Sequence, residues 1–144
     1  MQFILDNRAV PITTVEELRQ QLERVRRQQF SEVWVDAGEE GPALAMVVNG
    51  VHAWLMYLRD HHGDPGFSSP NPYDTGPAEA TTEFLLSNGQ MDEYPVAWTL
   101  PLEEACAACE YFVLSQGGQS PAIIWHDDSS SEPPADFRSA QRDH

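Results

Sequence analysis

Apolar residues recur at helical spacing in two stretches of the chain. The first, TVEELRQQLERVRRQQF, opens with Thr14 and Glu17 in the spacing of a capping box. Its apolar stripe is formed by Val15, Leu18, Leu22 and Val25. This pattern predicts a helix over residues 14–28 with an arginine-rich outer face. The second stretch, LEEACAACEYFVLSQ after Pro101, separates apolar side chains from glutamates in the same way and predicts a helix that ends before Gly117.

Between these stretches the pattern changes to short runs rich in β-branched and aromatic residues, which are typical of strands. Three runs, EVWVDAG, ALAMVVNG and VHAWLMYLRD, are separated by turn signals, and the second turn contains the hairpin-forming pair Asn-Gly. Another hairpin is predicted from ATTEFLLS and QMDEYPVAWTL, where Pro95 either places the second strand at a sheet edge or ends it in a bulge. QFIL at residues 2–5 and AIIW at residues 122–125 predict one short strand at each end.

These elements predict an α+β fold, in which an antiparallel meander sheet of five to six strands carries two helices packed on one face. At 144 residues the chain has the length of one domain. We expect this single domain to span residues 1–126, because the segment after it has too little apolar content to pack. Residues 127–144 are expected to form a disordered, acidic tail that contains serine and proline.

Charge is unevenly distributed along the chain. There are 23 acidic side chains against 8 basic ones, all of them arginines, and the net charge is -15. No lysine or arginine occurs from Asp60 through Phe137, whereas four arginines lie in the first predicted helix. This balance argues against direct binding to nucleic acid or to anionic membranes, because both require a basic surface. It favours fast, salt-dependent capture of a basic partner, although an acidic surface also serves solubility alone.

The chain carries no pattern of secretion or membrane insertion. Its N-terminus, MQFILDNRAV, lacks the segments of a signal peptide, and no window approaches the ~20 apolar residues of a membrane span. Cys106 and Cys109 lie on the apolar face of the second predicted helix, away from its N-terminus, so we expect buried core residues rather than a redox pair. Together these features predict a cytoplasmic protein.

The segment RDHHGDPGFSSPNPYDTG, residues 59–76, concentrates the side chains that can carry chemistry. His61, His62 and Asp64 are the one candidate metal site, but adjacent side chains in an extended segment point in opposite directions and converge poorly on one ion. A small metal-dependent enzyme that uses these three residues stays open as an alternative. Because the chain also lacks a nucleophile elbow and a phosphate-binding loop, we expect neither an enzyme nor a cofactor.

The aromatic residues divide into two groups by their surroundings. Trp34, Trp54 and Trp125 lie among apolar strand residues and are expected to anchor the core. Phe67 and Tyr73 lie in the loop between prolines and glycines, where they suit anchors for a partner's pocket, with neighbouring carboxylates to pair its cations. An alternative for Phe67 is that it folds back onto the core of its own domain.

Four segments of the chain, taken in order, resemble a known family. They are the early amphipathic helix, HAWLMYLRD leading into GDPGFSS, the hairpin FLLSNGQMDEYP, and the closing LEEACAACEYFVLSQGGQSPAIIW. Over most of residues 14–126 the chain is similar to the first of the numbered immunity protein families of bacterial polymorphic toxin systems, whose members are encoded beside deaminase toxins. Order and spacing carry this resemblance rather than any one motif.

The resemblance implies a non-catalytic inhibitor that neutralises a cognate toxin in the cytoplasm, typically a zinc-dependent, cytidine-type deaminase of nucleic-acid bases. Such a toxin has a basic substrate cleft, which an acidic protein can occlude. We expect contact through residues 60–74, helped by residues 90–94. The predicted toxin-binding residues are Asp60, Asp64, Phe67, Tyr73, Asp74, Asp92, Glu93 and Tyr94. An immunity or adaptor protein for a non-deaminase toxin, such as a nuclease, is an open alternative, and the oligomeric state is also open.

Overall fold

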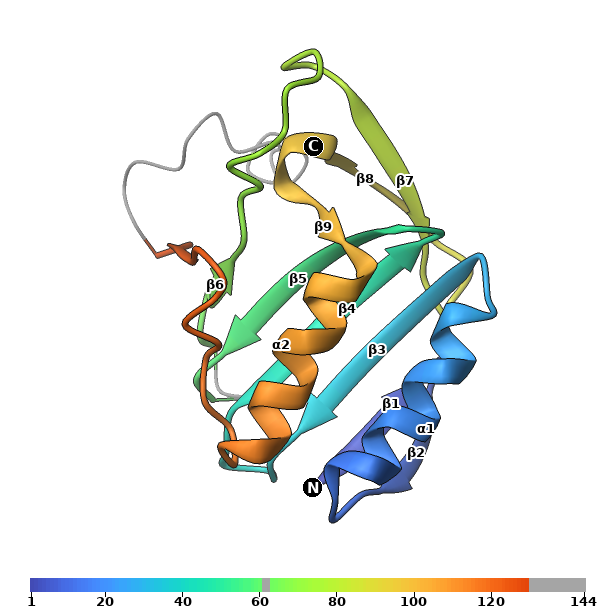
Figure 1. Ribbon diagram of the computed structural model, residues 1–144, viewed down its shortest axis with the longest axis vertical. Helices are drawn as coiled ribbons and strands as arrows, with labels where there is room; N and C mark the ends of the chain where they lie inside the picture. Colours follow the sequence, from blue (N-terminus) through green and yellow to red (C-terminus); the bar gives the residue numbers. More distant parts are fainter. Residues whose placement is uncertain (61–62, 130–144) are drawn as a thin grey trace.

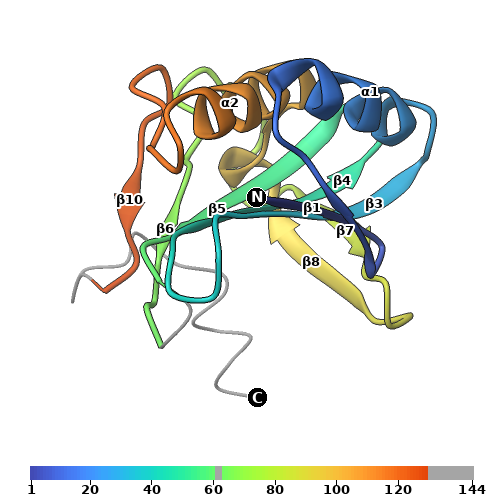
Figure 2. The same cartoon turned by 90° about the horizontal axis from the view of Figure 1, so that it is seen from below.

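The computed structural model describes residues 1–60 and 63–129 of the 144-residue chain. Two helices lie side by side over one face of an antiparallel sheet, and a β-hairpin lies against the opposite face (Figure 1, Figure 2). The predicted α+β class, with two helices packed on a sheet, is therefore confirmed.

α1 (Val15–Arg26) begins at the predicted cap. The Thr14 side chain accepts from the Glu17 backbone N–H, and the Glu17 carboxylate accepts from the Thr14 N–H, so the capping box is complete. The buried side chains of the helix, Leu18, Leu22 and Val25, belong to the predicted apolar stripe. The helix stops two residues short of the predicted end at residue 28.

α2 (Leu102–Leu114) begins directly after a proline and ends before a glycine, as predicted. Gly117 donates its N–H to the Phe112 carbonyl at 2.7 Å, which is the 6→1 bond of a Schellman motif, and its φ angle is 110°. Cys106 and Cys109 are buried in this helix, so the prediction of core cysteines is confirmed. Burial raises the pKa of both thiols.

The main sheet contains eight strands within the described residues, and every pairing is antiparallel. They are β1 (Gln2–Leu5), β2 (Arg8–Pro11), β3 (Phe30–Asp36), β4 (Ala43–Asn49), β5 (His52–Leu58), β6 (Phe67–Ser68), β9 (Leu100–Pro101) and β10 (His126–Asp127). Their order is β10-β6-β5-β4-β3-β1-β2, and β9 pairs with the start of β5. β7 (Thr81–Leu85) and β8 (Met91–Pro95) form a separate hairpin, which a 3-10 turn over Val96–Trp98 follows.

The predicted count of five to six strands is too low. The additional strands carry little sequence signal, because β6, β9 and β10 have only two residues each. β2 follows a tight turn at Asp6 and Asn7, whose φ angles of 48° and 70° fit a type I′ hairpin. Tertiary neighbours, rather than an apolar pattern, define these short pairings.

The strand predicted for AIIW, residues 122–125, is wrong. This segment contains a turn and belongs to no strand, and Ile124 is 54% exposed. Trp125 packs against the core, and its indole N–H donates to the Ser120 carbonyl at 3.0 Å. A short apolar run has no periodicity that distinguishes a strand from a packed loop, and here it belongs to a loop.

The folded domain extends past the predicted boundary at residue 126. β10 includes Asp127, and the next residue, Asp128, donates its backbone N–H to the Gly66 carbonyl at 2.9 Å. The Asp128 carboxylate also accepts from the Ser68 hydroxyl at 2.8 Å. These contacts attach the first residues of the predicted tail to β6 and the loop before it. Residues 130–144 of the predicted tail lie outside the described residues.

The main core lies between the helices and the inner face of the sheet. Alternate residues of β3, β4 and β5 point into it, and Val33, Met46 and Leu55 are buried there. Phe112 of α2 packs edge-on against Tyr57 of β5, with ring centroids 6.1 Å apart. Fully burying an apolar side chain of this kind contributes roughly 1.5–3 kcal/mol, so this layer holds the domain together.

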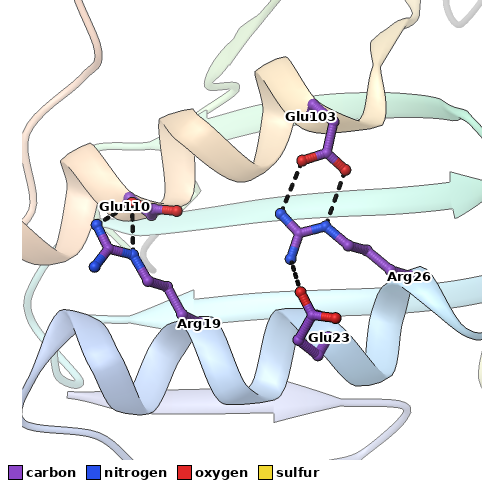
Figure 3. Close-up of polar contacts among 5 residues, drawn as sticks. All are labelled: Arg19, Glu23, Arg26, Glu103 and Glu110. Carbon is purple, nitrogen blue, oxygen red and sulfur yellow. Dashed lines mark hydrogen bonds and ion pairs between the residues drawn. The ribbon is translucent and has the colours of Figure 1, made fainter.

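Two arginines of α1 form ion pairs with glutamates of α2 (Figure 3). The Arg26 guanidinium donates from Nε and Nη2 to the two carboxylate oxygens of Glu103, at 2.9 Å each, and from Nη1 to Glu23 at 2.8 Å. Arg19 donates from Nε and Nη2 to Glu110 at 3.1 and 2.9 Å. The bonds from Arg26 lower the pKa of the Glu103 carboxyl. Arg19 and Arg26 of α1 therefore join the two helices through ion pairs within the chain.

Candidate binding surface

Asp64 is held inside the loop that follows β5. Its carboxylate accepts three hydrogen bonds from Arg59, from the backbone N–H at 2.7 Å, from Nε at 3.2 Å and from Nη2 at 2.6 Å. The bonds from the Arg59 side chain lower the pKa of the Asp64 carboxyl to about 2, although burial acts in the opposite direction. Only 3% of the Asp64 side chain is exposed. Asp64 therefore neutralises an arginine of its own chain.

Phe67 folds back onto the domain, which is the alternative that the sequence left open. It lies in β6 and packs against the core, with its ring centroid 6.2 Å from that of Tyr57. The guanidinium carbon of Arg59 lies 5.0 Å from the centre of the Phe67 ring, within the range of a cation–π contact. Asp60, beside this cluster at the end of β5, is half-buried.

Two residues of the alternative metal site, His61 and His62, lie outside the described residues. The third, Asp64, is bonded to Arg59. Within residues 1–60 and 63–129, no group of three or more histidine, cysteine, aspartate or glutamate side chains is placed to hold a metal ion.

The loop between β6 and β7 is exposed and is attached at both ends to the 3-10 turn that follows the hairpin. Asn71 donates its N–H to the Ala97 carbonyl at 2.7 Å, and Val96 donates its N–H to the Ala80 carbonyl at 2.9 Å. Between these two attachments lies Tyr73, which is 82% exposed. The loop and the base of the hairpin therefore form one continuous part of the surface.

The hairpin of β7 and β8 is fastened across the outer face of the main sheet, opposite the helices (Figure 2). The Glu32 carboxylate of β3 accepts from both the backbone N–H and the hydroxyl of Ser87, at 2.9 and 2.8 Å. Asn49, at the end of β4, donates to the Glu83 carbonyl at 2.8 Å. Phe84 of β7 is completely buried. These contacts fix the position of the hairpin on the sheet.

An open cavity of about 140 Å³ lies between the hairpin and strands β3, β4 and β5. Its walls include Trp34, Trp54 and Tyr94. The rings of Trp54 and Tyr94 stack, with centroids 4.6 Å apart and planes 9° apart. Two carboxylates, those of Glu32 and Asp92, also line the cavity. The outer face of the sheet and the hairpin therefore form an aromatic and acidic cavity.

Several acidic residues in the second half of the chain make no ion pair with an arginine of the described residues. Between Asp60 and Asp128, only Asp64, Glu103 and Glu110 pair with an arginine of the described residues. Five acids make no ion pair with any residue that the structure describes, and these are Asp74, Glu79, Glu83, Asp92 and Glu104. We refer to the β6–β7 loop and the hairpin, residues 71–95, as the acidic hairpin surface.

The predicted toxin-binding residues fall into two groups at different places in the fold (Figure 1). The acidic hairpin surface contains Tyr73, Asp74, Asp92, Glu93 and Tyr94. The other group, Asp60, Asp64 and Phe67, lies around the end of β5 that is farther from the hairpin. The second half of the predicted loop is attached to the 3-10 turn that follows the hairpin, and Tyr73 lines a pocket there with Leu100 and Glu104. The first half of the loop lies apart from both.

Glu32, Trp34 and Trp54 line a cavity that the sequence pattern did not predict. Strand β3 reads FSEVWVD, and its buried positions alternate with half-buried ones, so Glu32 and Trp34 lie on the face opposite Val33 and Val35. This period of two was the available signal, because the tryptophan shares its face with acidic residues rather than with the valines. Trp54 is buried, as a core anchor should be, but its ring stacks on the hairpin.

The chain matches none of the protein-family models with which it was compared, and it matches no curated protein. Neither helix in residues 1–60 and 63–129 has the length and apolar content needed to cross a membrane. The side chains of the acidic hairpin surface are therefore the basis for a functional proposal.

Proposed function

We propose that this chain is a non-catalytic inhibitor that binds the basic cleft of a toxin through the acidic hairpin surface. The proposed toxin is a cytidine-type deaminase of nucleic-acid bases, and the chain acts in the cytoplasm as its cognate immunity protein. One observation carries the proposal. Four carboxylates within residues 71–95 have no ion pair with the described residues, and Tyr73 in the same stretch of chain is 82% exposed.

The proposal follows from what a deaminase of nucleic-acid bases requires. Its substrate is anionic, so the cleft around the active site carries lysines and arginines that bind phosphates. An acidic protein can pair with the same cations and exclude the nucleic acid. Carboxylates on a hairpin that is already fastened to the sheet lose little conformational freedom on binding. Complementary charge also speeds association at low ionic strength.

The proposed contacts differ from the predicted set because some of its members already have partners inside the fold. Phe67 packs on the core and Asp64 pairs with Arg59, so neither is included. Tyr94 stacks on Trp54 within the fold, so it is not included either. The proposed contacts are Tyr73, Asp74, Glu79, Glu83 and Asp92.

The test uses the C-terminal domain of a toxin encoded by the neighbouring gene. We expect the full chain to form a one-to-one complex with that domain and to stop its deamination of nucleic acid. In stopped-flow measurements at about 0.1 M salt, Glu83→Lys should slow association roughly fivefold to tenfold, because a repulsive charge replaces an attractive one.

Glu39→Lys is the matched control. Glu39 is exposed and makes no ion pair with the described residues, and it lies in the β3–β4 loop, at the end of the sheet away from the hairpin (Figure 1). The same change of charge there should alter the association rate by less than about twofold. Equal slowing by both variants would contradict the hairpin as the contact surface. Absence of a complex, or a complex that still deaminates, would contradict the function itself.

Two other outcomes would assign a different function. Inhibition of a nuclease toxin would keep the inhibitor and change its target, since a nuclease also needs a basic cleft. Stoichiometric zinc or manganese in the purified chain would instead support the metal-dependent enzyme that uses His61, His62 and Asp64.

A further inference from the structure

The cavity beneath the hairpin contains two carboxylates that no cation among the described residues neutralises. Glu32 accepts two hydrogen bonds from Ser87 and one from the Trp34 indole N–H, the last at 3.2 Å. Asp92 accepts from the Tyr94 hydroxyl at 3.2 Å and from a glutamine amide at 2.8 Å. All of these donors are neutral, so the two negative charges face the cavity without compensation by these bonds.

Both carboxylates also have room for another donor. A carboxylate offers roughly four acceptor positions, of which Glu32 uses three and Asp92 uses two. Burial raises the pKa of the Glu32 carboxyl, but the bonds from Ser87 and Trp34 together outweigh it and leave the pKa below its usual value. Glu32 is therefore ionised at neutral pH, and the cavity carries negative charge where a ligand enters.

The remaining walls are aromatic and apolar. Trp34, Trp54 and Tyr94 supply aromatic rings. Trp54 and Tyr94 stack on each other, and the ring of Trp34 can attract a cation through its face. Val47 and Met56, on the sheet, can pack against the methylene groups of a long side chain. A purely apolar ligand would remove the two carboxylates from water without giving them a partner, which is unfavourable. These walls therefore suit a cation on an apolar stem.

We propose that this cavity receives an arginine side chain of the partner protein, with the guanidinium bound by Glu32 and Asp92 against the aromatic walls. The inference rests on the proposed function and deepens it, because it names the residue type that anchors the partner. A planar guanidinium stacks on aromatic rings and donates in several directions, whereas the ammonium of lysine is compact and strongly hydrated. The Ser87–Glu32 bonds and the Trp54–Tyr94 stack fix the cavity before binding, which lowers the ordering cost.

The test uses the full chain and two small probes. N-acetyl-arginine amide carries the guanidinium, and N-acetyl-citrulline amide has nearly the same shape without the charge. Binding is followed through the NMR signals of the Trp34 and Trp54 indole N–H groups. We expect the arginine probe to shift both signals saturably, with a Kd of roughly 1–10 mM, and the citrulline probe to bind about tenfold more weakly.

Two matched variants localise the effect. Asp92→Asn keeps the shape of the cavity and removes one of its charges, so it should weaken binding of the arginine probe about fivefold. Asp74→Asn removes one charge from the same acidic hairpin surface outside the cavity and should change binding by less than about twofold. Equal binding of the two probes, no saturable shift with the arginine probe, or unchanged binding in Asp92→Asn would each overturn the proposal.

The chain's own arginines in residues 130–144 are the other possible occupants. They are tested in the full-length Arg138→Gln, Arg142→Gln double variant. Unchanged affinity for the arginine probe supports an arginine of the partner, whereas affinity increased about tenfold would show competition from within the chain and overturn the proposal. The arginine site and the proposed inhibitor function can be refuted by different results. If the chain inhibits the toxin but does not bind the arginine probe, only the arginine site is contradicted. If the chain binds the probe but forms no complex with the toxin, the proposed function is contradicted.

Discussion

The two faces of the main sheet differ in how they use polar side chains. On the inner face, buried apolar residues pack between the sheet and the helices, and surface charges pair between α1 and α2 (Figure 3). On the outer face, hydrogen bonds and an aromatic stack hold the hairpin, and the Glu83 and Asp92 carboxylates make no ion pair with the described residues. The comparison separates a layer that stabilises the domain from a layer whose charges are available for contact.

The same strands build both layers. In β3, Val33 and Val35 face the main core, while Glu32 and Trp34 face the hairpin. Because side chains alternate along a strand, one set of positions can be selected for packing while the other set is selected for binding. Substitutions on the inner face should therefore reduce stability most, and substitutions on the outer face should reduce binding at a smaller cost in stability.

The largest expected difference in stability is between Phe112→Ala and Tyr94→Ala. Phe112 is completely buried in the main core, and its loss should lower the free energy of unfolding by about 3–5 kcal/mol through lost burial and a residual cavity. Tyr94 is half-buried and stacks on Trp54, so its loss should cost about 1–2 kcal/mol. Urea denaturation followed by circular dichroism measures both values.

Equal losses in the two variants would show that the outer layer is a second core, and the contrast between the faces would then fail. If Phe112→Ala is too unstable to measure, Phe112→Leu provides a milder test. Leucine retains much of the side-chain volume. Phe112→Leu should still lower the free energy of unfolding by more than Tyr94→Leu does.

A smaller effect is expected at Asp64, the acid near β6 that the chain pairs internally. Its pKa of about 2 in the folded chain lies below the value of about 3.9 in an unfolded chain, so its stabilising effect is complete above pH 4 and is lost as the pH falls toward 2. Asp64→Asn should therefore be less stable than the parent chain by about 1 kcal/mol at pH 7. The value is modest because the Arg59 side chain is 53% exposed.

Urea denaturation at pH 7, 4 and 2 checks this dependence. The difference between Asp64→Asn and the parent chain should shrink to a small part of its pH 7 value at pH 2, where about half of the parent carboxyl is protonated. Asp74→Asn, which removes an acid without an ion pair among the described residues, should show no such convergence. A difference that persists undiminished at pH 2 would mean that Asp64 stabilises the loop through its shape rather than its charge.

Much of the fold was predictable because its longer elements carry their own signals. The capping box at Thr14, the apolar stripes of both helices and the alternation of β3 are local patterns. The two-residue strands are not local, since β10 pairs with β6 across a sequence separation of 58 residues, from Ser68 to His126. No property of a dipeptide encodes such a partner. The apolar run AIIW, in contrast, gave a signal that fits a packed loop equally well.

The candidate surface was predicted only in part, because exposure and ion pairing depend on tertiary contacts. Tyr73 and Asp74 follow prolines in an exposed loop, as expected from the sequence. Asp64 belongs to the same proline-rich and glycine-rich segment, yet Arg59 folds onto it and removes its charge from the surface. The cavity was missed for a similar reason. Glu32 and Asp92 are distant in sequence and meet only because the hairpin folds across the sheet.

The smallest effects should come from single surface charges, and they test the comparison most directly. Arg26→Gln removes the guanidinium that joins Glu103 and Glu23, so it should lower the free energy of unfolding by about 0.5–1 kcal/mol, and by less at about 0.5 M NaCl. Glu83→Gln should change it by less than about 0.5 kcal/mol, because Glu83 has no ion pair with the described residues. Urea denaturation at both salt concentrations measures the two variants. If Arg26→Gln and Glu83→Gln are equally destabilised, the Glu83 carboxylate contributes to the stability of the fold. If Glu83→Gln instead leaves the stability unchanged and still associates more slowly with the toxin, the Glu83 charge serves binding and not the stability of the fold.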